Sequence, residues 1–140
     1  MKILALDTAT SACSAALMGD GAIIASALVA MRRGHAEALL PMVDAVMAEA
    51  GVAYGALDLI ATTVGPGAFT GLRVGLAAAR GLALAGGLPI VGVTTLEALA
   101  HAVGADQRGK RPVVAVINAR RDEVYYQPFD AALKIGRAHV

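Results

Sequence analysis

The chain has 140 residues, of which 57% are hydrophobic and 16% charged, and its formal net charge is +1. This length is enough for a domain with its own hydrophobic core. A net charge so close to zero gives no electrostatic argument for nucleic-acid binding by the chain alone. The single cysteine, Cys13, excludes an internal disulfide, which fits a cytoplasmic protein. The uncharged runs 3–6 and 81–93 are too short for a signal peptide and a membrane span, respectively.

The first third of the chain predicts an antiparallel meander followed by a helix. A short apolar run opens the sequence, and two further strand-like runs flank the turn Gly19-Asp20-Gly21, so we expect the last two strands to form a hairpin. Apolar residues then recur at helical spacing, and Pro41 in this segment either begins the helix or kinks it. The expected strands are residues 2–6, 11–18 and 22–29, and the expected helix is 34–51.

The middle of the chain predicts alternating strands and helices. A continuous apolar run ends at a glycine-rich loop formed by Gly65, Pro66 and Gly67, followed by Phe69 and Thr70. We expect Thr70 to cap a long helix that begins at Gly71. Thr94 or Thr95 is expected to cap a later helix with Glu97 in its first turn. The expected strands are 57–64 and 89–93, and the later helix is 94–103.

This order predicts an α/β fold of the ribonuclease-H-like or actin-like class. An antiparallel meander feeding right-handed β-α-β crossovers gives a mixed five-stranded sheet flanked by helices. Residues 104–111 are polar and are expected to form a linker, and 112–117 and 123–129 are expected strands of an incomplete second lobe. We therefore expect an N-terminal lobe over 1–106, a linker and truncated second lobe over 107–133, and a non-native tail over 134–140.

The predicted long helix carries a stripe of small residues at every fourth position: Gly71, Gly75, Ala79, Ala83 and Gly87. Each interior glycine costs a helix about 0.5–1 kcal/mol relative to alanine. A close neighbour must offset this cost. That neighbour is either this chain's own sheet or a helix of another protein, and the pattern alone leaves both open.

Four segments resemble the TsaB family, also called YeaZ: MKILALDTATSACSAAL, GHAEALLPMV, TTVGPGAFTGLRVGLAAARGLAL and VTTLEALA. The resemblance implies a non-catalytic actin-like subunit without a cofactor that dimerises with a TsaD-like transferase and supports threonylcarbamoyladenosine formation in tRNA. It also implies a TsaE-like ATPase as a further partner, a possible homodimer, and contact with tRNA only through the complex. The predicted partner interface comprises Leu39, Leu40, Val43, Gly71, Arg73, Gly75, Ala79 and Ala83.

The resemblance also implies that Asp7, Thr8 and Thr10 are the remnant of a phosphate loop. We expect Asp7 to be a hydrogen-bond anchor at a strand end rather than a catalytic carboxylate, with weak nucleotide binding left open. Metal binding in TsaD needs two histidines four residues apart. The histidines here are His35, His101 and His139, so no metal site is expected. Asn118 stands where the family usually has aspartate.

Two other functions compete with this interpretation. A nucleotide-binding actin-like kinase would need an intact second phosphate loop, and an M22-type glycopeptidase would need the missing histidine pair. The segment KIGRAHV, residues 134–140, does not resemble the family and matches a translated sequencing adapter. The sequence therefore predicts a C-terminally truncated chain, and a divergent natural tail is the alternative.

Overall fold

The structure is a computed structural model of the chain, and it describes residues 1–135. A five-stranded mixed sheet with the strand order β3-β2-β1-β4-β5 forms its first part. Strands β1, β2 and β3 pair antiparallel, whereas β4 pairs parallel with both β1 and β5. This arrangement confirms the predicted α/β fold with a mixed sheet. The strands are β1 (Lys2–Asp7), β2 (Ala12–Gly19), β3 (Ala22–Ala30), β4 (Leu59–Thr63) and β5 (Ile90–Val93).

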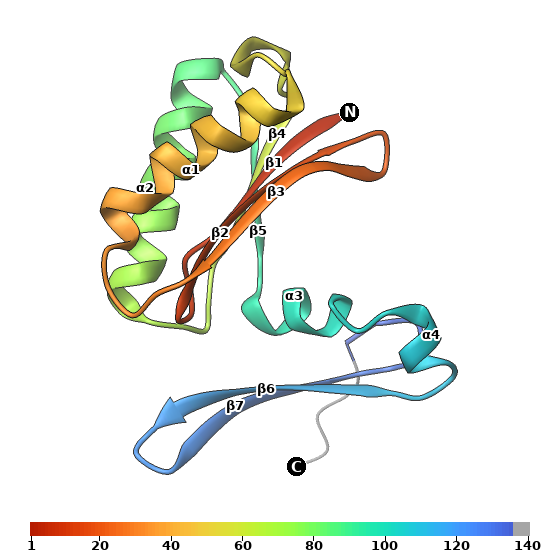
Figure 1. The fold of residues 1–140 in the computed structure, drawn as a ribbon. Helices are drawn as coiled ribbons and strands as arrows, with labels where there is room; N and C mark the ends of the chain where they lie inside the picture. The colour runs from red at the N-terminus through yellow and green to blue at the C-terminus, as the bar shows by residue number, and fades with distance from the viewer. Residues whose placement is uncertain (136–140) are drawn as a thin grey trace.

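Helices α1 (His35–Ala50) and α2 (Phe69–Gly86) lie side by side on one face of this sheet (Figure 1). Alternate strand residues, such as Leu4, Leu17 and Ile60, point toward the two helices and are fully buried. They pack against α1 and the small residues of α2 to form the main hydrophobic core. None of the helices in the described part of the chain is long and apolar enough to cross a membrane.

The opposite face of the sheet, which we call the far face, carries half-exposed and exposed apolar side chains. The register places Ile3, Met18 and Ile23 in one row across three strands. Leu28 of β3 is 71% exposed and Ile23 is 65% exposed. The helices that pack on the sheet, α1 and α2, both lie on the other side (Figure 1). The far face is therefore a broad apolar surface.

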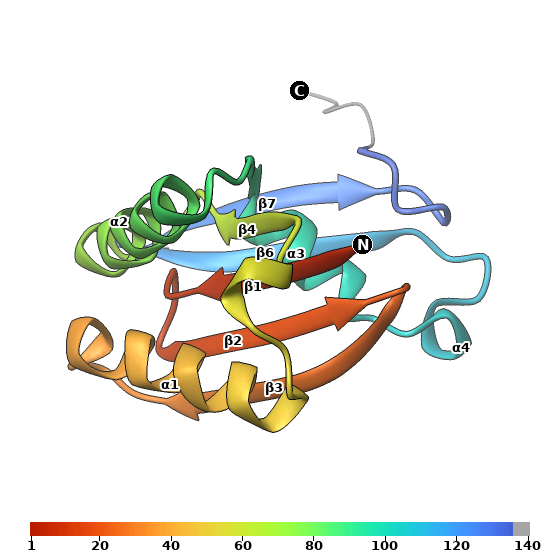
Figure 2. The same ribbon diagram turned by 90° about the horizontal axis from the view of Figure 1, so that it is seen from above.

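A second, smaller unit follows β5. Strands β6 and β7 form an antiparallel hairpin, and α3 packs across one face of it through Leu96, Ala100, Ala115 and Phe129 (Figure 2). By packing, α3 belongs with this hairpin rather than with the five-stranded sheet. The expected domain boundary at residue 106 itself stays a prediction. The elements are α3 (Thr95–His101), α4 (Ala105–Arg108), β6 (Val113–Arg120) and β7 (Glu123–Phe129), and a short 3-10 turn, η1 (Tyr54–Ala56), precedes β4.

Three local predictions need correction. Helix α2 begins at Phe69 after Ala68, not at Gly71, and Thr70 does not cap it. The expected linker contains a helical turn, α4, and Arg108 on this turn donates hydrogen bonds to the carbonyl oxygens of Val103 and Ala131. Helix α1 does not begin at the proline, because it runs through Pro41 from His35. The end of the predicted tail, residues 136–140 with His139, lies outside the described residues.

Candidate functional site: a cleft between the two units

The loop between β1 and β2 is fastened to the start of α2. The Thr8 hydroxyl donates a 2.6 Å hydrogen bond to the carbonyl oxygen of Gly71. One residue on, the Ala9 carbonyl oxygen accepts a 2.8 Å bond from the backbone N–H of Ala68. Because backbone atoms of Ala68 and Gly71 take part in these bonds, the start of α2 must lie closer to the loop than it could with larger side chains between them. The predicted phosphate-loop remnant is therefore packed against the predicted glycine-rich loop.

Glycines make this close approach possible. A Cβ atom added to Gly71 would lie 2.2 Å from the Thr8 carbonyl oxygen, and one added to Gly67 would lie 2.3 Å from the Ala9 carbonyl oxygen. At Gly75 the added atom would lie 2.6 Å from the Thr8 hydroxyl. The stripe of small residues on α2 thus faces this chain's own sheet. Of the two alternatives that the pattern left open, packing within the chain holds.

This finding corrects much of the predicted partner interface. A side chain buried inside its own fold cannot touch another protein, and six of the eight predicted interface residues are buried in this way. Only Leu40 on α1 and Arg73 on α2 are exposed. Arg73 places its guanidinium 3.8 Å from the ring centroid of Phe69, so it packs on an aromatic ring. The six buried residues are Leu39, Val43, Gly71, Gly75, Ala79 and Ala83.

Asp7 acts as the hydrogen-bond anchor that we expected. Its Oδ1 atom accepts a 2.9 Å bond from the Ala9 backbone N–H and a 2.8 Å bond from the Thr63 hydroxyl. These bonds hold the end of β1 to the end of β4 and shape the loop that follows. The nearby thiol of Cys13 is buried, and burial, with a smaller contribution from the Asp7 charge, raises its pKa. A thiol in this environment is a poor nucleophile.

A cleft of about 1140 Å³, which we call the interlobe cleft, separates the first unit from the tip of the β6–β7 hairpin. The N-terminal ends of α1 and α2 form one wall, and the hairpin tip forms the other (Figure 1). The cleft brings together Thr10 with Gly67, Phe69 and Thr70 from the predicted loops, whereas Gly65 and Pro66 do not line it. Its lining comprises residues 9–11, 32–37, 67–71, 74, 117–120 and 125.

Positive charge dominates the lining of the interlobe cleft. Arg32 and Arg33 come from the segment before α1, Arg120 comes from the hairpin tip, and Glu37 is the only carboxylate among them. His35 is held in place by a 3.2 Å contact between its Nε2 atom and the Thr10 carbonyl oxygen. Residues 1–135 contain no cluster of histidine, cysteine or acidic side chains that could hold a metal ion.

Asn118 shapes the hairpin tip of the cleft. Its side-chain oxygen accepts a 2.7 Å hydrogen bond from the backbone N–H of Arg120. Arg120, Arg121 and Asp122 all have positive φ angles in this turn. An amide oxygen can accept this bond as a carboxylate would, so the asparagine keeps the turn without a negative charge.

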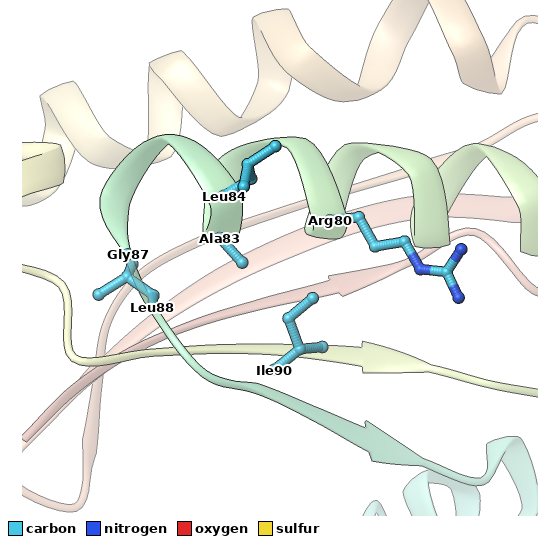
Figure 3. Close-up of a pocket in the computed structure, with 6 residues that line it drawn as sticks. All are labelled: Arg80, Ala83, Leu84, Gly87, Leu88 and Ile90. Carbon is cyan, nitrogen blue, oxygen red and sulfur yellow. The ribbon is translucent and has the colours of Figure 1, made fainter.

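The outward sides of α1 and α2 form a second candidate surface, which we call the outer helical face. Small exposed residues recur on α2 at every fourth position as Ala77, Gly81 and Ala85, and a Cβ atom at Gly81 would meet nothing within 4 Å. Leu84 beside them is 85% exposed. Leu84 is also one of the residues that line a shallow hollow of about 490 Å³ between the C-terminal end of α2 and the start of β5, and Figure 3 shows these residues. On α1 the exposed apolar residues of this face are Leu40, Pro41, Ala45 and Ala48, and the exposed carboxylates of Glu37 and Asp44 lie among them.

The sequence matches the model of one protein family over residues 28–137, and this family is described as TsaD, tRNA N6-adenosine threonylcarbamoyltransferase. This chain belongs to the TsaD family. Within this family, comparison with curated relatives confirms the resemblance to TsaB. The chain is 41% identical over 129 residues to "tRNA threonylcarbamoyladenosine biosynthesis protein TsaB" of Escherichia coli, and 40% identical over 126 residues to the protein of the same name from Haemophilus influenzae.

These alignments cover 92% and 90% of this chain but only 55% and 52% of the two relatives. The chain thus spans about half the length of the curated TsaB proteins that it matches. A solved structure, "YeaZ from Pseudomonas aeruginosa", is 41% identical, with a TM-score of 0.89 over 98% of this chain and 65% of that one. This member of the TsaD family therefore shares the YeaZ fold almost throughout its length.

More distant structures share the fold alone. A ROK hexokinase from Thermus thermophilus has a TM-score of 0.60 at 19% identity, and covers 99% of this chain and 49% of that one. An activator of 2-hydroxyisocaproyl-CoA dehydratase from Clostridium difficile has a TM-score of 0.54 at 16% identity, and covers 96% and 43%. Both likenesses support the predicted actin-like class.

Sequence reasoning missed two groups of residues at these sites. The arginines of the cleft stand in the pairs Arg32-Arg33 and Arg120-Arg121, and these pairs were visible as local charge but not as neighbours in space. The exposed stripe of Ala77, Gly81 and Ala85 has the same four-residue spacing as the buried one. A helical projection that included both stripes could have found it.

Proposed function

We propose that the chain is a non-catalytic subunit of the machinery that makes threonylcarbamoyladenosine in tRNA. In this role it dimerises with a TsaD-like threonylcarbamoyltransferase, a TsaE-like ATPase joins the pair, and the work takes place in the cytoplasm. The names of the TsaB relatives support a role in the biosynthesis of threonylcarbamoyladenosine in tRNA. The observation that carries the partner role is the exposed small stripe of α2 beside Leu84.

The outer helical face has the chemistry of a close helix–helix contact. Residues without long side chains let two helices approach with their backbones near each other, which increases the van der Waals contact. Such a strip on α2 is formed by Ala77, Gly81 and Ala85. Leu84 provides an exposed apolar side chain, and its burial by a partner stabilises the complex. The residues that make the contact are thus the exposed stripe and not the buried one.

The state of Asp7 supports the non-catalytic part of the proposal. Its Oδ1 atom is engaged by the Ala9 N–H and the Thr63 hydroxyl. A carboxylate with these two partners holds a loop in shape, and a catalytic role would require Asp7 to rearrange or to recruit its other oxygen.

Gly81→Gln tests the partner role. Glutamine is a good helix former and Gly81 has open space around it, so the variant should fold while its side chain separates the two helices. We expect co-purification with the TsaD-like subunit to fall at least tenfold, measured by pull-down of the tagged partner.

The matched control is Leu99→Gln on α3, an exposed residue that lies outside the outer helical face. It should leave co-purification unchanged. Retention of the partner by Gly81→Gln at the wild-type level would contradict this interface, and failure of the wild-type chain to capture the partner would contradict the proposed function.

A further inference from the structure

We propose that the interlobe cleft binds a short single-stranded stretch of RNA, with arginines holding phosphates and two aromatic rings stacking on bases. The choice of RNA rather than DNA rests on the proposed function, since the modified molecule is a tRNA. The cleft itself is argued from its charge, its aromatic side chains and its size.

The arginines of the cleft are free to take an anionic ligand. Within residues 1–135 the one ion pair joins the N-terminal amine to Asp20. The guanidinium groups of Arg32, Arg33 and Arg120 therefore have no carboxylate partner in this part of the chain. Glu37 is the only acidic side chain in the lining. Three guanidinium groups against one carboxylate, drawn from both walls, match the repeated negative charge of a phosphodiester backbone.

Exposed aromatic rings lie on both walls among these charges. Phe69 at the start of α2 is 69% exposed, with Arg73 packed on one face of its ring, and Tyr125 of β7 is 49% exposed. Tyr125 lies on the same face of the hairpin as Ile117, its partner in the register. A positively charged groove interleaved with exposed aromatic rings is the arrangement that binds single-stranded nucleic acids, because every base can stack on a ring.

The size of the cleft favours an RNA strand over a free nucleotide. A volume of about 1140 Å³ exceeds the range of about 300–1,000 Å³ that is usual for pockets holding one small molecule.

The first test measures RNA binding by the full 140-residue chain through fluorescence anisotropy. The probe is a labelled single-stranded RNA of about eight nucleotides, within the range of sites on single-strand binding folds. If three arginines hold three phosphates, log K should fall with log salt at a slope of about −2, and Arg33→Ala should reduce that slope by about 0.7. A wild-type chain with no binding, or with no salt dependence, would overturn the proposal.

Charge-reversal variants locate the binding in the cleft. Arg33→Glu and Arg120→Glu, one on each wall, should each weaken RNA binding at least tenfold. Lys110→Glu is the matched control, since it makes the same change of charge on an exposed residue outside the cleft. Circular dichroism confirms that each variant is folded. Equal losses in all three variants would show nonspecific attraction and overturn the proposal.

Neighbouring tyrosines test the stacking. Tyr125 and Tyr126 point to opposite faces of the hairpin, and only Tyr125 lines the cleft. Tyr125→Ala should weaken RNA binding at least about fivefold, Tyr125→Phe should restore it, and Tyr126→Ala should leave it unchanged. Binding that is insensitive to Tyr125→Ala, or AMP that competes as well as the RNA per nucleotide, would overturn the strand assignment.

The two proposals fail separately. Arg33 lies outside the outer helical face, so Arg33→Glu should lose RNA binding and keep the TsaD-like partner. A chain that binds RNA in the cleft but captures no partner would leave this inference standing and remove the proposed function.

Discussion

Two glycines of helix α2 have opposite reasons to be glycine. A Cβ atom at Gly71 would lie 2.2 Å from a backbone oxygen of Thr8, whereas one at Gly81 would meet nothing within 4 Å. The backbone of the β1–β2 loop cannot move aside without losing the bonds that tie it to α2. At Gly71 the missing side chain therefore makes the fold possible, while at Gly81 it weakens the helix and serves no packing within the described chain.

This difference gives a matched pair of alanine substitutions. Gly71→Ala should lower the free energy of unfolding by about 1–3 kcal/mol, the usual cost of overpacking. Gly81→Ala should raise it by up to about 1 kcal/mol through helix propensity. Urea unfolding of the two variants and the wild type measures both effects, and a loss of stability at Gly81 equal to that at Gly71 would contradict this account.

A pair of side chains, Tyr54 in η1 and Asp44 in α1, links the turn after α1 to that helix. The Tyr54 hydroxyl donates a hydrogen bond to the Asp44 carboxylate. Burial, together with this bond and the negative charge of Asp44, raises the pKa of Tyr54 to about 12. Because the folded pKa lies above the ordinary value of about 10, the stabilisation is complete below pH 10 and is lost as the pH rises toward the folded value.

Asp44→Ala should therefore lower the pKa of Tyr54, although burial keeps it above the ordinary value. Absorbance titration of phenolate formation measures the change, and Tyr54→Phe identifies which step belongs to this residue. A titration curve that Asp44→Ala leaves unchanged would show that the carboxylate has no influence on the phenol.

At the scale of elements, the start of α3 is fixed by a reciprocal cap. The Thr94 hydroxyl accepts a bond from the Glu97 backbone N–H, and the Glu97 carboxylate accepts a bond from the Thr94 backbone N–H. These bonds from Thr94 lower the pKa of Glu97. A lowered folded pKa means that the stabilisation is present above the unfolded value of about 4.3 and is lost as the pH falls through the folded value.

Thr94→Ala should lower the free energy of unfolding by about 1 kcal/mol at neutral pH. Glu97→Gln should remove the acid-dependent part, so its difference from the wild type should shrink as the pH falls below about 4. Thermal unfolding over a series of pH values measures both. A difference that stays constant with pH would contradict the role of the carboxylate charge.

Local chemistry in the sequence predicted this cap but not the start of α2. Thr94 and Glu97 satisfy each other within one turn, so the signal is complete in the local sequence. Thr70 has the residue type of a cap, yet α2 begins at Phe69. The preceding N–H of Ala68 bonds to Ala9, a residue far away in the sequence. Helix propensity depends on the local sequence, so it cannot predict a contact between residues this far apart in the chain.

For the whole molecule, the alternation of strands and helices predicted the sheet, whereas the partner surface was predicted wrongly in part. Helix α2 carries small residues on two faces, beginning at Gly71 and at Ala77. Both faces have the same spacing, and only the position of the sheet decides which one is buried. The periodicity therefore predicts that α2 has a face of small residues, but it does not predict whether that face points toward the sheet or toward solvent.

Net charge was a poor guide to the interlobe cleft for a related reason. A value of +1 sums over the whole chain, whereas a ligand responds to the charges within about a Debye length. Arg33 and Arg120 are distant in the sequence, and the fold places them on opposite walls of one cleft. The net-charge prediction therefore does not address this local cluster of arginines, and the RNA-binding experiment tests whether the chain alone contacts nucleic acid.

The far face of the five-stranded sheet affects how the chain behaves as a solute. Leu28 and Ile23 leave an apolar surface in contact with water, and copies of the chain associate through such surfaces as the protein concentration rises. Capture experiments at high concentration would then combine specific docking with adhesion between copies. Dilution series, light scattering and a trace of mild detergent separate the two, since adhesion disappears under conditions that leave a well-packed contact intact.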